Sequence, residues 1–127
     1  MGGFLLDTNV LIASINESVD QLPLRIRTAL SDPESRLVVS VVSPWEISIK
    51  SSLGKLTLKQ PVSRIGQPVS AMGATMLALS LDHALEVAHP EPATKDPFDR
   101  LLLAVCACEG LKLLTTDAKL AGHRLVY

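Results

Sequence analysis

The sequence predicts an α/β fold with a mostly parallel central sheet of four to five short strands, flanked by helices. Short apolar runs alternate along the chain with longer segments of helical character, and Gly, Pro and capping residues separate the two kinds. Such alternation is typical of parallel sheets whose faces are covered by helices. The 127 residues contain no internal repeat or low-complexity tract, so we expect a single domain over residues 1–127.

The first 54 residues are expected to form two strands and three helices. Residues 3–6 are apolar, as in a buried strand, and residues 10–13 begin the first helix. Apolar residues at helical spacing predict a second helix over residues 21–30, and the β-branched run at residues 37–42 predicts a strand buried on both faces. The third helix opens at residues 43–46 and ends at Gly54. Its apolar stripe at i, i+4 and i+8 consists of Trp45, Ile49 and Leu53.

The rest of the chain is expected to complete the sheet. Residues 55–73 are the least regular part, because they contain two Pro and two Gly. Strands are expected at residues 74–79 and 111–114, with residues 124–127 as a candidate fifth, and short helices at residues 62–65, 82–88 and 118–121.

A long buried helix is expected to follow Asp96. This residue is a suitable N-cap, Pro97 suits the first helical position, and Gly110 suits the C-terminus. Residues 101–107 are almost entirely apolar, so the helix should be buried on most sides. Asp99 then lies in the first turn, at the border of the core, where an acid is stabilised by the helix dipole or serves a site.

Composition limits the possible functions. Hydrophobic residues make up 47% and charged residues 20% of the chain, as in a folded globular protein. Aromatic residues are only 3%, so stacking platforms for single-stranded bases should be few. The formal net charge of -1 provides no basic footprint for duplex binding. Contact with a nucleic acid would therefore be local or mediated by cations.

The sequence also predicts a soluble protein of the cytoplasm, with no membrane contact. No apolar run reaches the length of a membrane span, and the first residues lack the basic region and cleavage signal of a secretory peptide. Cys106 and Cys108 lie two apart on one helix, where they cannot bridge each other. We expect both to be small core residues in a reducing environment.

Four acids are expected to meet at one edge of the sheet. Asp7 and Asp117 follow predicted strands, Glu46 opens the helix after another, and Asp99 opens the buried helix. Ligand sites of open parallel sheets lie beyond the carboxyl ends of the strands. Each acid also has a structural alternative: Asp7 and Asp117 as N-caps, and Glu46 in a capping box with Ser43.

Like charges at one rim raise one another's pKa, and a bound divalent cation would neutralise them. Carboxylates without His or Cys at ligand spacing favour Mg²⁺ or Mn²⁺ over Zn²⁺. His83, His89 and His123 lie in unrelated segments and are expected in surface or core roles. A cation held in this way can activate water and stabilise charge on a phosphoryl oxygen, which is the chemistry of phosphodiester hydrolysis.

Four motifs resemble the PIN-domain ribonucleases, and more narrowly the VapC-type toxins of bacterial type II toxin–antitoxin pairs. They are Leu-Leu-Asp-Thr-Asn-Val-Leu-Ile at 5–12, Ser-Pro-Trp-Glu-Ile-Ser-Ile-Lys-Ser-Ser-Leu-Gly-Lys-Leu at 43–56, Lys-Asp-Pro-Phe-Asp-Arg-Leu-Leu at 95–102 and Leu-Leu-Thr-Thr-Asp at 113–117. The resemblance spans the whole chain. It implies a PIN-like fold and an endoribonuclease that uses Mg²⁺ or Mn²⁺, forms a homodimer and is silenced by a small cognate antitoxin.

By position, the resemblance assigns the catalytic and metal-binding quartet to Asp7, Glu46, Asp99 and Asp117. It assigns supporting roles to Asn9 beside the first acid, Thr115 before the last, and Asp96. The chain departs from many relatives in carrying Thr94 where they have His, which affects a contact behind the acids. Lys50 and Arg100 are candidates for substrate phosphate contact, with ion pairing as the structural alternative.

Two other families of proteins use acids at the ends of strands. A phosphatase of the haloacid-dehalogenase type needs a second Asp where this chain has Asn9. A phosphoacceptor receiver module needs a Lys after a late strand, and here that strand ends in Thr-Thr-Asp. A catalytically silent PIN-like or receiver-like binding or signalling module is the alternative to the nuclease.

Overall fold

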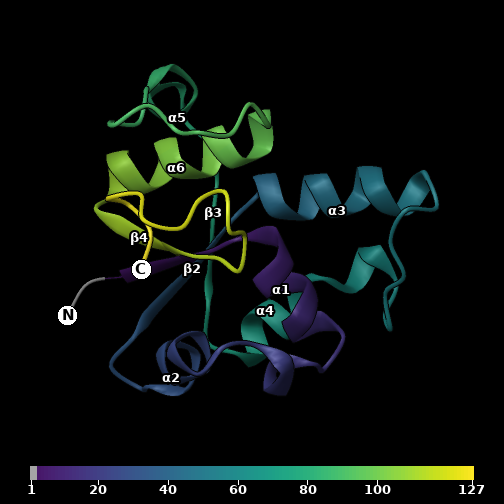
Figure 1. The fold of residues 1–127 in the computed structure, drawn as a ribbon. Coiled ribbons are helices and arrows are strands. Elements are labelled where there is room, and N and C mark those ends of the chain that lie inside the picture. The colour runs from purple at the N-terminus through teal and green to yellow at the C-terminus, as the bar shows by residue number, and fades with distance from the viewer. Residues whose placement is uncertain (1–2) are drawn as a thin grey trace.

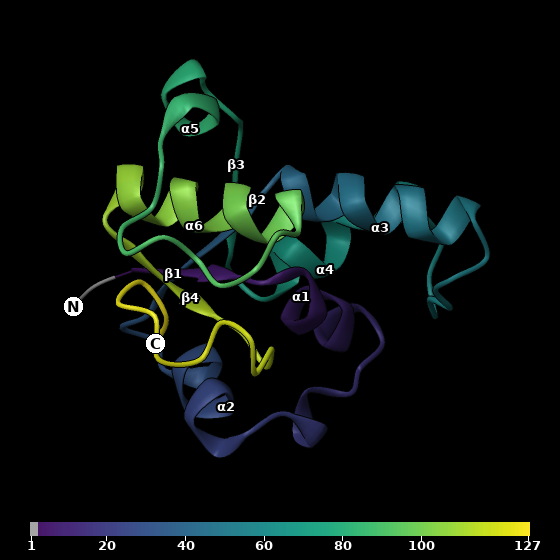
Figure 2. The same cartoon turned by 45° about the horizontal axis from the view of Figure 1, so that its top comes forward.

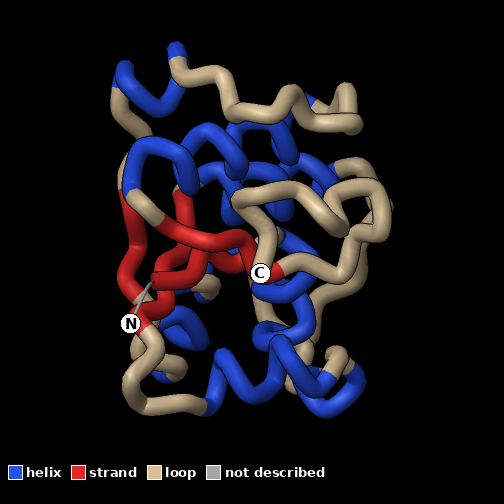
Figure 3. The backbone as a smooth tube through the Cα atoms, turned by 60° about the vertical axis from the view of Figure 1, so that its left-hand side comes forward, coloured by secondary structure: helices blue, strands red, loops and turns tan. Residues whose placement is uncertain are grey.

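The computed structural model describes residues 3–127 and has four parallel strands in one sheet between helical layers (Figure 1). The strand order is β3-β2-β1-β4. The strands are β1 (Gly3–Leu6), β2 (Arg36–Ser40), β3 (Thr75–Leu77) and β4 (Leu111–Leu114). Figure 3 shows them gathered in the middle of the molecule, with helices on both sides. The predicted α/β architecture with a parallel sheet is confirmed.

Six α-helices surround the sheet. They are α1 (Thr8–Ile15), α2 (Leu24–Ser31), α3 (Val42–Ser52), α4 (Gly66–Ala71), α5 (Leu81–Leu85) and α6 (Pro97–Glu109), with single 3₁₀ turns at Val19–Gln21 and Val62–Arg64. Helices α1, α2 and α4 cover one face of the sheet and α6 covers the other. Helix α5 packs on the outer side of α6, away from the strands (Figure 2).

The two faces of β1 explain why its sequence is apolar throughout. Phe4 and Leu6 belong to the core under α1, α2 and α4, whereas Leu5 belongs to the core under α6. Successive side chains of a strand point to opposite faces, so a strand covered on both sides needs apolar residues at every position. Strand β2 follows the same rule, with Val38 facing α6 and Val39 facing the other core.

The first half of the chain departs from the predicted boundaries in several places. Helix α1 begins at Thr8 rather than Val10, and α2 begins only at Leu24, because Pro23 is its N-cap. Strand β2 ends at Ser40, and α3 begins at Val42.

The predicted stripe of α3 does not enter the core: Trp45 is 58% and Leu53 is 62% exposed. Only the first turns of α3 are buried, and the rest extends beyond the sheet (Figure 1).

The second half differs mainly in short elements. Residues 62–65 form a 3₁₀ turn, and α4 follows it although no helix was predicted there. Strand β3 and helix α5 are shorter than expected. Residues 118–121 form turns rather than a helix, and residues 124–127 contribute a single bridge between Leu113 and Val126 rather than a fifth strand.

Helix α6 agrees closely with its prediction. The side chain of Asp96 accepts a hydrogen bond from the Phe98 N–H, Pro97 starts the helix, and Gly110 adopts a left-handed conformation (φ 68°) at the C-cap. Cys106 is buried as expected, but Cys108 is exposed, because two residues in a helix point about 200° apart. Within residues 3–127, every helix falls short of the length and apolarity that a bilayer crossing requires.

Candidate active site

Asp7 lies at the carboxyl end of β1, where the chain turns into α1. Its side chain is 4% exposed and caps α1, because Oδ1 accepts a hydrogen bond of 2.8 Å from the Thr8 N–H. Oδ2 accepts a hydrogen bond of 2.5 Å from the Thr115 hydroxyl, which follows β4. The parallel pairing of β1 with β4 brings these residues together across 108 positions of sequence. Two donors therefore fix the orientation of the Asp7 carboxylate.

Glu46 reaches the same place from the second turn of α3. Its side chain is buried, and both oxygens are engaged. Oε1 accepts a hydrogen bond of 2.7 Å from the Thr8 hydroxyl, and Oε2 lies 2.6 Å from the ammonium of Lys50, one turn further along α3. The Thr8 hydroxyl also lies 3.0 Å from the hydroxyl of Ser43. Thr8 thus contacts Asp7 through its backbone and Glu46 through its side chain.

Asp117 is held in the loop after β4. Its backbone N–H donates to the Thr115 hydroxyl at 3.0 Å, and its Oδ1 accepts from the Lys119 N–H at 2.9 Å. Thr115 therefore links the first and last acids, since one hydroxyl donates to Asp7 and accepts from Asp117. No helix follows Asp117, so its predicted alternative as an N-cap is wrong.

Asp99 lies in the first turn of α6. The Thr94 hydroxyl donates to its Oδ2 at 3.3 Å and accepts from the Asp96 N–H at 3.1 Å. Arg100 turns the other way: its Nε donates to the Thr94 carbonyl oxygen at 2.9 Å, and its Nη2 lies 3.2 Å from Glu91. Thr94 therefore contacts Asp99 directly.

The acids perturb one another. Burial is the main cause that raises the pKa of Asp7, and the charges of Glu46 and Asp117 raise it further, against the hydrogen bonds from Thr115 and Thr8. Burial also raises the pKa of Asp99 to about 6, with added contributions from the charges of Asp96, Asp7 and Asp117. The structure thus brings acids from β1, α3, α6 and the loop after β4 into one electrostatic cluster. We call Asp7, Glu46, Asp99 and Asp117 the acidic cluster.

The chain matches the family model of the PIN domain over residues 4–124. It is a PIN-domain protein. PIN domains form a family associated with nuclease activity. Among curated proteins the chain has no match.

The donor set of this PIN domain fits a hard divalent cation. All four members of the acidic cluster offer carboxylate oxygens, the ligands that Mg²⁺ and Mn²⁺ prefer. Burial and, after it, the charges of neighbouring acids raise the pKa of Asp7 and Asp99, and a bound cation would offset both effects. As the side chains lie in residues 3–127, no three His, Cys, Asp or Glu groups form a ready-made metal-binding group. Cation binding would therefore require some side chains of the cluster to move.

Sequence reasoning missed two residues of this PIN-domain site and misassigned a third contact. Thr8 adjoins Asp7 and Ser43 lies three residues before Glu46, but the contacts of their side chains join segments 35 or more residues apart. The predicted capping box of Ser43 with Glu46 is wrong, because α3 is preceded by Val41 and no side chain caps it. Asn9 is exposed, and Asp7 accepts its hydrogen bonds from Thr8 and Thr115 instead.

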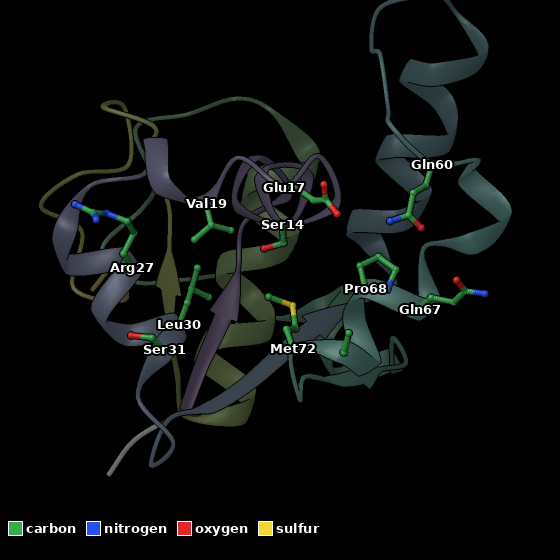
Figure 4. A pocket seen from close by; sticks show the side chains of 11 residues that line it. Ser14, Glu17, Val19, Arg27, Leu30, Ser31, Gln60, Gln67, Pro68 and Met72 are labelled. Carbon is green, nitrogen blue, oxygen red and sulfur yellow. The ribbon is translucent and has the colours of Figure 1, made fainter.

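A pocket of about 570 Å³ lies apart from the acidic cluster, between α1, α2 and α4 (Figure 4). Arg27 of α2 and Gln67 of α4 lie on opposite sides of it, with Ser14 at the end of α1 between them. None of the four acids lines this pocket. The pocket and the acidic cluster are therefore separate features of the molecule.

Proposed function

We propose that this PIN-domain protein is a divalent-cation-dependent endoribonuclease, a hydrolase of RNA phosphodiester bonds. The observation that carries the proposal is the gathering of carboxylates from four separate segments, in which burial and, after it, neighbouring like charges raise the pKa of Asp7 and Asp99. A fold gains nothing in stability from such crowding. The cluster is therefore better explained by a ligand of opposite charge than by structure alone.

Asp7, Glu46, Asp99 and Asp117 would hold Mg²⁺ or Mn²⁺. When bound, a cation of this kind lowers the pKa of water and offsets the negative charge that develops at phosphorus. It would also let a chain with a net charge of -1 hold a polyanion.

The protein's own residues orient the carboxylates that would hold the cation. The Thr8 N–H and the Thr115 hydroxyl donate to the two oxygens of Asp7, and the Thr94 hydroxyl donates to one oxygen of Asp99. Hydrogen bonds of this kind fix the orientation of metal ligands.

The sequence makes Lys50 and Arg100 candidates for contact with a substrate phosphate, but both side chains have partners within the protein. Lys50 pairs with Glu46, and Arg100 pairs with Glu91 and the backbone of Thr94. Ion pairing, the structural alternative to phosphate contact, therefore describes both side chains.

The biological role that we propose is that of the toxin of a toxin–antitoxin pair, acting in the cytoplasm and silenced by a cognate antitoxin. The VapC-like motifs support this role. A homodimer belongs to the same proposal, and Leu81 and Leu85 of α5, which are 72% and 71% exposed, offer apolar surface for an interface. A short reading frame that overlaps the start of this gene would support the pairing, and light scattering would give the oligomeric state.

The test of activity is RNA digestion with Mg²⁺, with Mn²⁺ and with EDTA. We expect cleavage that EDTA stops and that excess Mn²⁺ restores. Asp7→Asn should lower the rate by at least about 100-fold, since it removes a charge placed for the reaction. Its thermal melting temperature should stay at or above that of the wild type, because one buried negative charge is gone.

The control is Asp32→Asn, which removes a carboxylate in the loop before β2 that accepts a hydrogen bond from the Glu34 N–H. This variant should cleave RNA like the wild type. Full activity of Asp7→Asn in excess Mg²⁺ would show that the site is misassigned. A wild-type protein that cleaves no RNA with either cation, yet binds RNA or a protein partner, would favour the silent binding module.

A further inference from the structure

The ammonium of Lys50 lies beside a carboxylate oxygen of Glu46 that a bound cation would also need. It lies 2.6 Å from Oε2 of Glu46, and the side chains of Lys50 and Glu46 are 44% and 7% exposed. The hydrogen bond to Glu46 is the main cause that raises the pKa of Lys50, and the charges of Glu46, Asp96 and Asp99 raise it further against the effect of burial. The ammonium therefore lies between α3 and the start of α6, in the field of the acidic cluster.

We infer that Lys50 is an intramolecular competitor of the divalent cation, which holds Glu46 in the resting protein and must release it before the cation binds. This inference rests on the proposed function and adds a regulatory element to the same site. In this role Lys50 does not contact the substrate phosphate, and it does more than stabilise α3. It sets the cation concentration at which the site fills.

The contacts of Glu46 give the physical reason. Both carboxylate oxygens are already engaged, Oε1 by the Thr8 hydroxyl and Oε2 by Lys50. Across the described residues 3–127, no ready-made group of three metal ligands is present while this arrangement holds. A cation that needs Glu46 thus binds only the fraction of molecules in which Lys50 has turned away. The apparent affinity for the cation is therefore the intrinsic affinity multiplied by that fraction.

The exposure of the two side chains allows this exchange. Lys50 is nearly half exposed, so its long side chain can leave toward solvent without unfolding α3, whereas Glu46 stays buried. An ion pair that is partly open to water is worth little, so it can be displaced. It would be costly to leave the buried Glu46 carboxylate without a partner. Either the Lys50 ammonium or the divalent cation should therefore always be bound to it.

The test compares Mn²⁺ binding to the wild type, Lys50→Met and Lys119→Met. Mn²⁺ binding is measured by isothermal titration calorimetry and by the electron paramagnetic resonance signal of free Mn²⁺, with no RNA present. Lys119→Met is the matched control, because this exposed residue lies two positions after Asp117 and carries the same charge near the cluster. It removes long-range repulsion of the cation but leaves the Lys50–Glu46 pair in place.

We expect Lys50→Met to bind Mn²⁺ with a Kd about five-fold lower than that of the wild type, the size expected for loss of a partly exposed ion pair. Lys119→Met should change the Kd by less than about two-fold, since exposed charges are screened by salt. Without cation, Lys50→Met should melt at a lower temperature than the wild type. Saturating Mn²⁺ should abolish this difference in melting temperature, because the bound cation then replaces Lys50 as the partner of Glu46 and stabilises the folded state.

Each outcome bears on the inference. Tighter Mn²⁺ binding by Lys50→Met alone supports it, as does binding by that variant when the wild type binds none. An unchanged Kd in Lys50→Met, or an equal change in Lys119→Met, overturns it while leaving the proposed nuclease intact. If neither the wild type nor either variant binds Mn²⁺ or Mg²⁺, the proposed cation dependence fails and the inference with it. Should Lys50→Met not fold, judged by circular dichroism, Lys50→Gln takes its place with the same expectations.

Discussion

Two regions of the molecule bury polar side chains, and they do so in opposite ways. At the carboxyl edge of the sheet, the buried groups are carboxylates of like charge. Between α5 and α6, the buried group is His83, which is 2% exposed and lies with Nε2 2.7 Å from Oε2 of Glu109. Both regions are reached by α6, whose first turn carries Asp99 and whose last turn carries Glu109.

The contact between α5 and α6 is complementary. Nδ1 of His83 accepts a hydrogen bond from the Ser80 N–H at 3.1 Å, and the Ser80 hydroxyl accepts one from the His83 N–H at 3.1 Å. Because Nδ1 accepts, the ring hydrogen lies on Nε2 and is donated to Glu109. Every polar atom has a partner of opposite character, so this region needs no ligand.

The carboxylates of the acidic cluster also have hydrogen-bond partners, but too few to offset burial and like charge. Asp7 receives two hydrogen bonds, yet its pKa is raised, because burial and the charges of Glu46 and Asp117 outweigh them. The comparison shows that burial of a polar group does not by itself mark a functional site. The crowding of several like charges, which Lys50 offsets only at Glu46, distinguishes the carboxyl edge from the α5–α6 contact.

The largest effect on stability is expected at the complementary contact. His83→Ala removes the links of the imidazole to Glu109 and Ser80 and leaves a small cavity, which should lower the free energy of unfolding by about 2 kcal/mol. RNA cleavage under native conditions should be unchanged, because the contact serves only to dock α5 on α6.

Urea denaturation measures the stability and RNA digestion measures the activity. His89→Ala, at an exposed His in the loop before α6, is the control and should change neither. Loss of cleavage by a folded His83→Ala variant would mean that the α5–α6 contact acts on the site, and the two regions would not be separable.

A smaller effect, of opposite sign, is expected at the acidic cluster. The pKa of Asp99 is about 6 in the folded protein, against an ordinary value of 3.8 for an Asp side chain in water, so folding disfavours its charged form. The wild type is therefore destabilised above about pH 6, and this penalty disappears as the pH falls below the unfolded value. Asp99→Asn removes the penalty. It should raise the free energy of unfolding at pH 7.5 by about 1 kcal/mol, a value reduced for the partial exposure of Asp99.

The difference between Asp99→Asn and the wild type should shrink as the pH falls through 6 and vanish below 4. Urea titrations at several pH values, without divalent cations, measure it. Asp32→Asn should show no such gain at pH 7.5, since Asp32 lies in the loop before β2 and outside the cluster. A variant Asp99→Asn that is less stable than the wild type at pH 7.5 would show that Asp99 is a structural residue.

The sequence was sufficient for the parts of the structure that depend on local pattern and topology. Strands β1 and β2 are apolar at successive positions because both faces are covered, and α6 carries its own start and stop signals in Asp96, Pro97 and Gly110. The expected gathering of the acids followed from one rule about parallel sheets, because each acid lies shortly after a strand or within the first two turns of a helix.

The rest depends on contacts between distant segments. Helix α4 contains Pro68 and starts at Gly66, so its local signals oppose a helix, yet Val69 is buried in the core and holds it in place. Ser43 was expected to cap α3, but its hydroxyl meets Thr8 instead. The Lys50–Glu46 pair was foreseeable from the i, i+4 spacing, whereas the location of this pair among the other carboxylates was not.

The smallest effect is expected at the two thiols of α6, which lie between the compared regions. Burial raises the pKa of Cys106 to about 12, with a further contribution from the charge of Asp7, and burial with the charges of Glu86, Asp82 and Glu109 raises that of Cys108. Only the thiolate reacts with iodoacetamide, and only an exposed one is reached. At pH 8 the native protein should therefore gain one adduct, at Cys108, more slowly than free cysteine, without change in cleavage or melting temperature. Mass spectrometry with peptide mapping locates it, and urea should expose Cys106 to a second adduct. An adduct at Cys106 in the native protein would mean that α6 opens on its apolar side. Helix α6 would then not be fixed in place, although both the buried contact with α5 and the raised pKa of Asp99 require that it is.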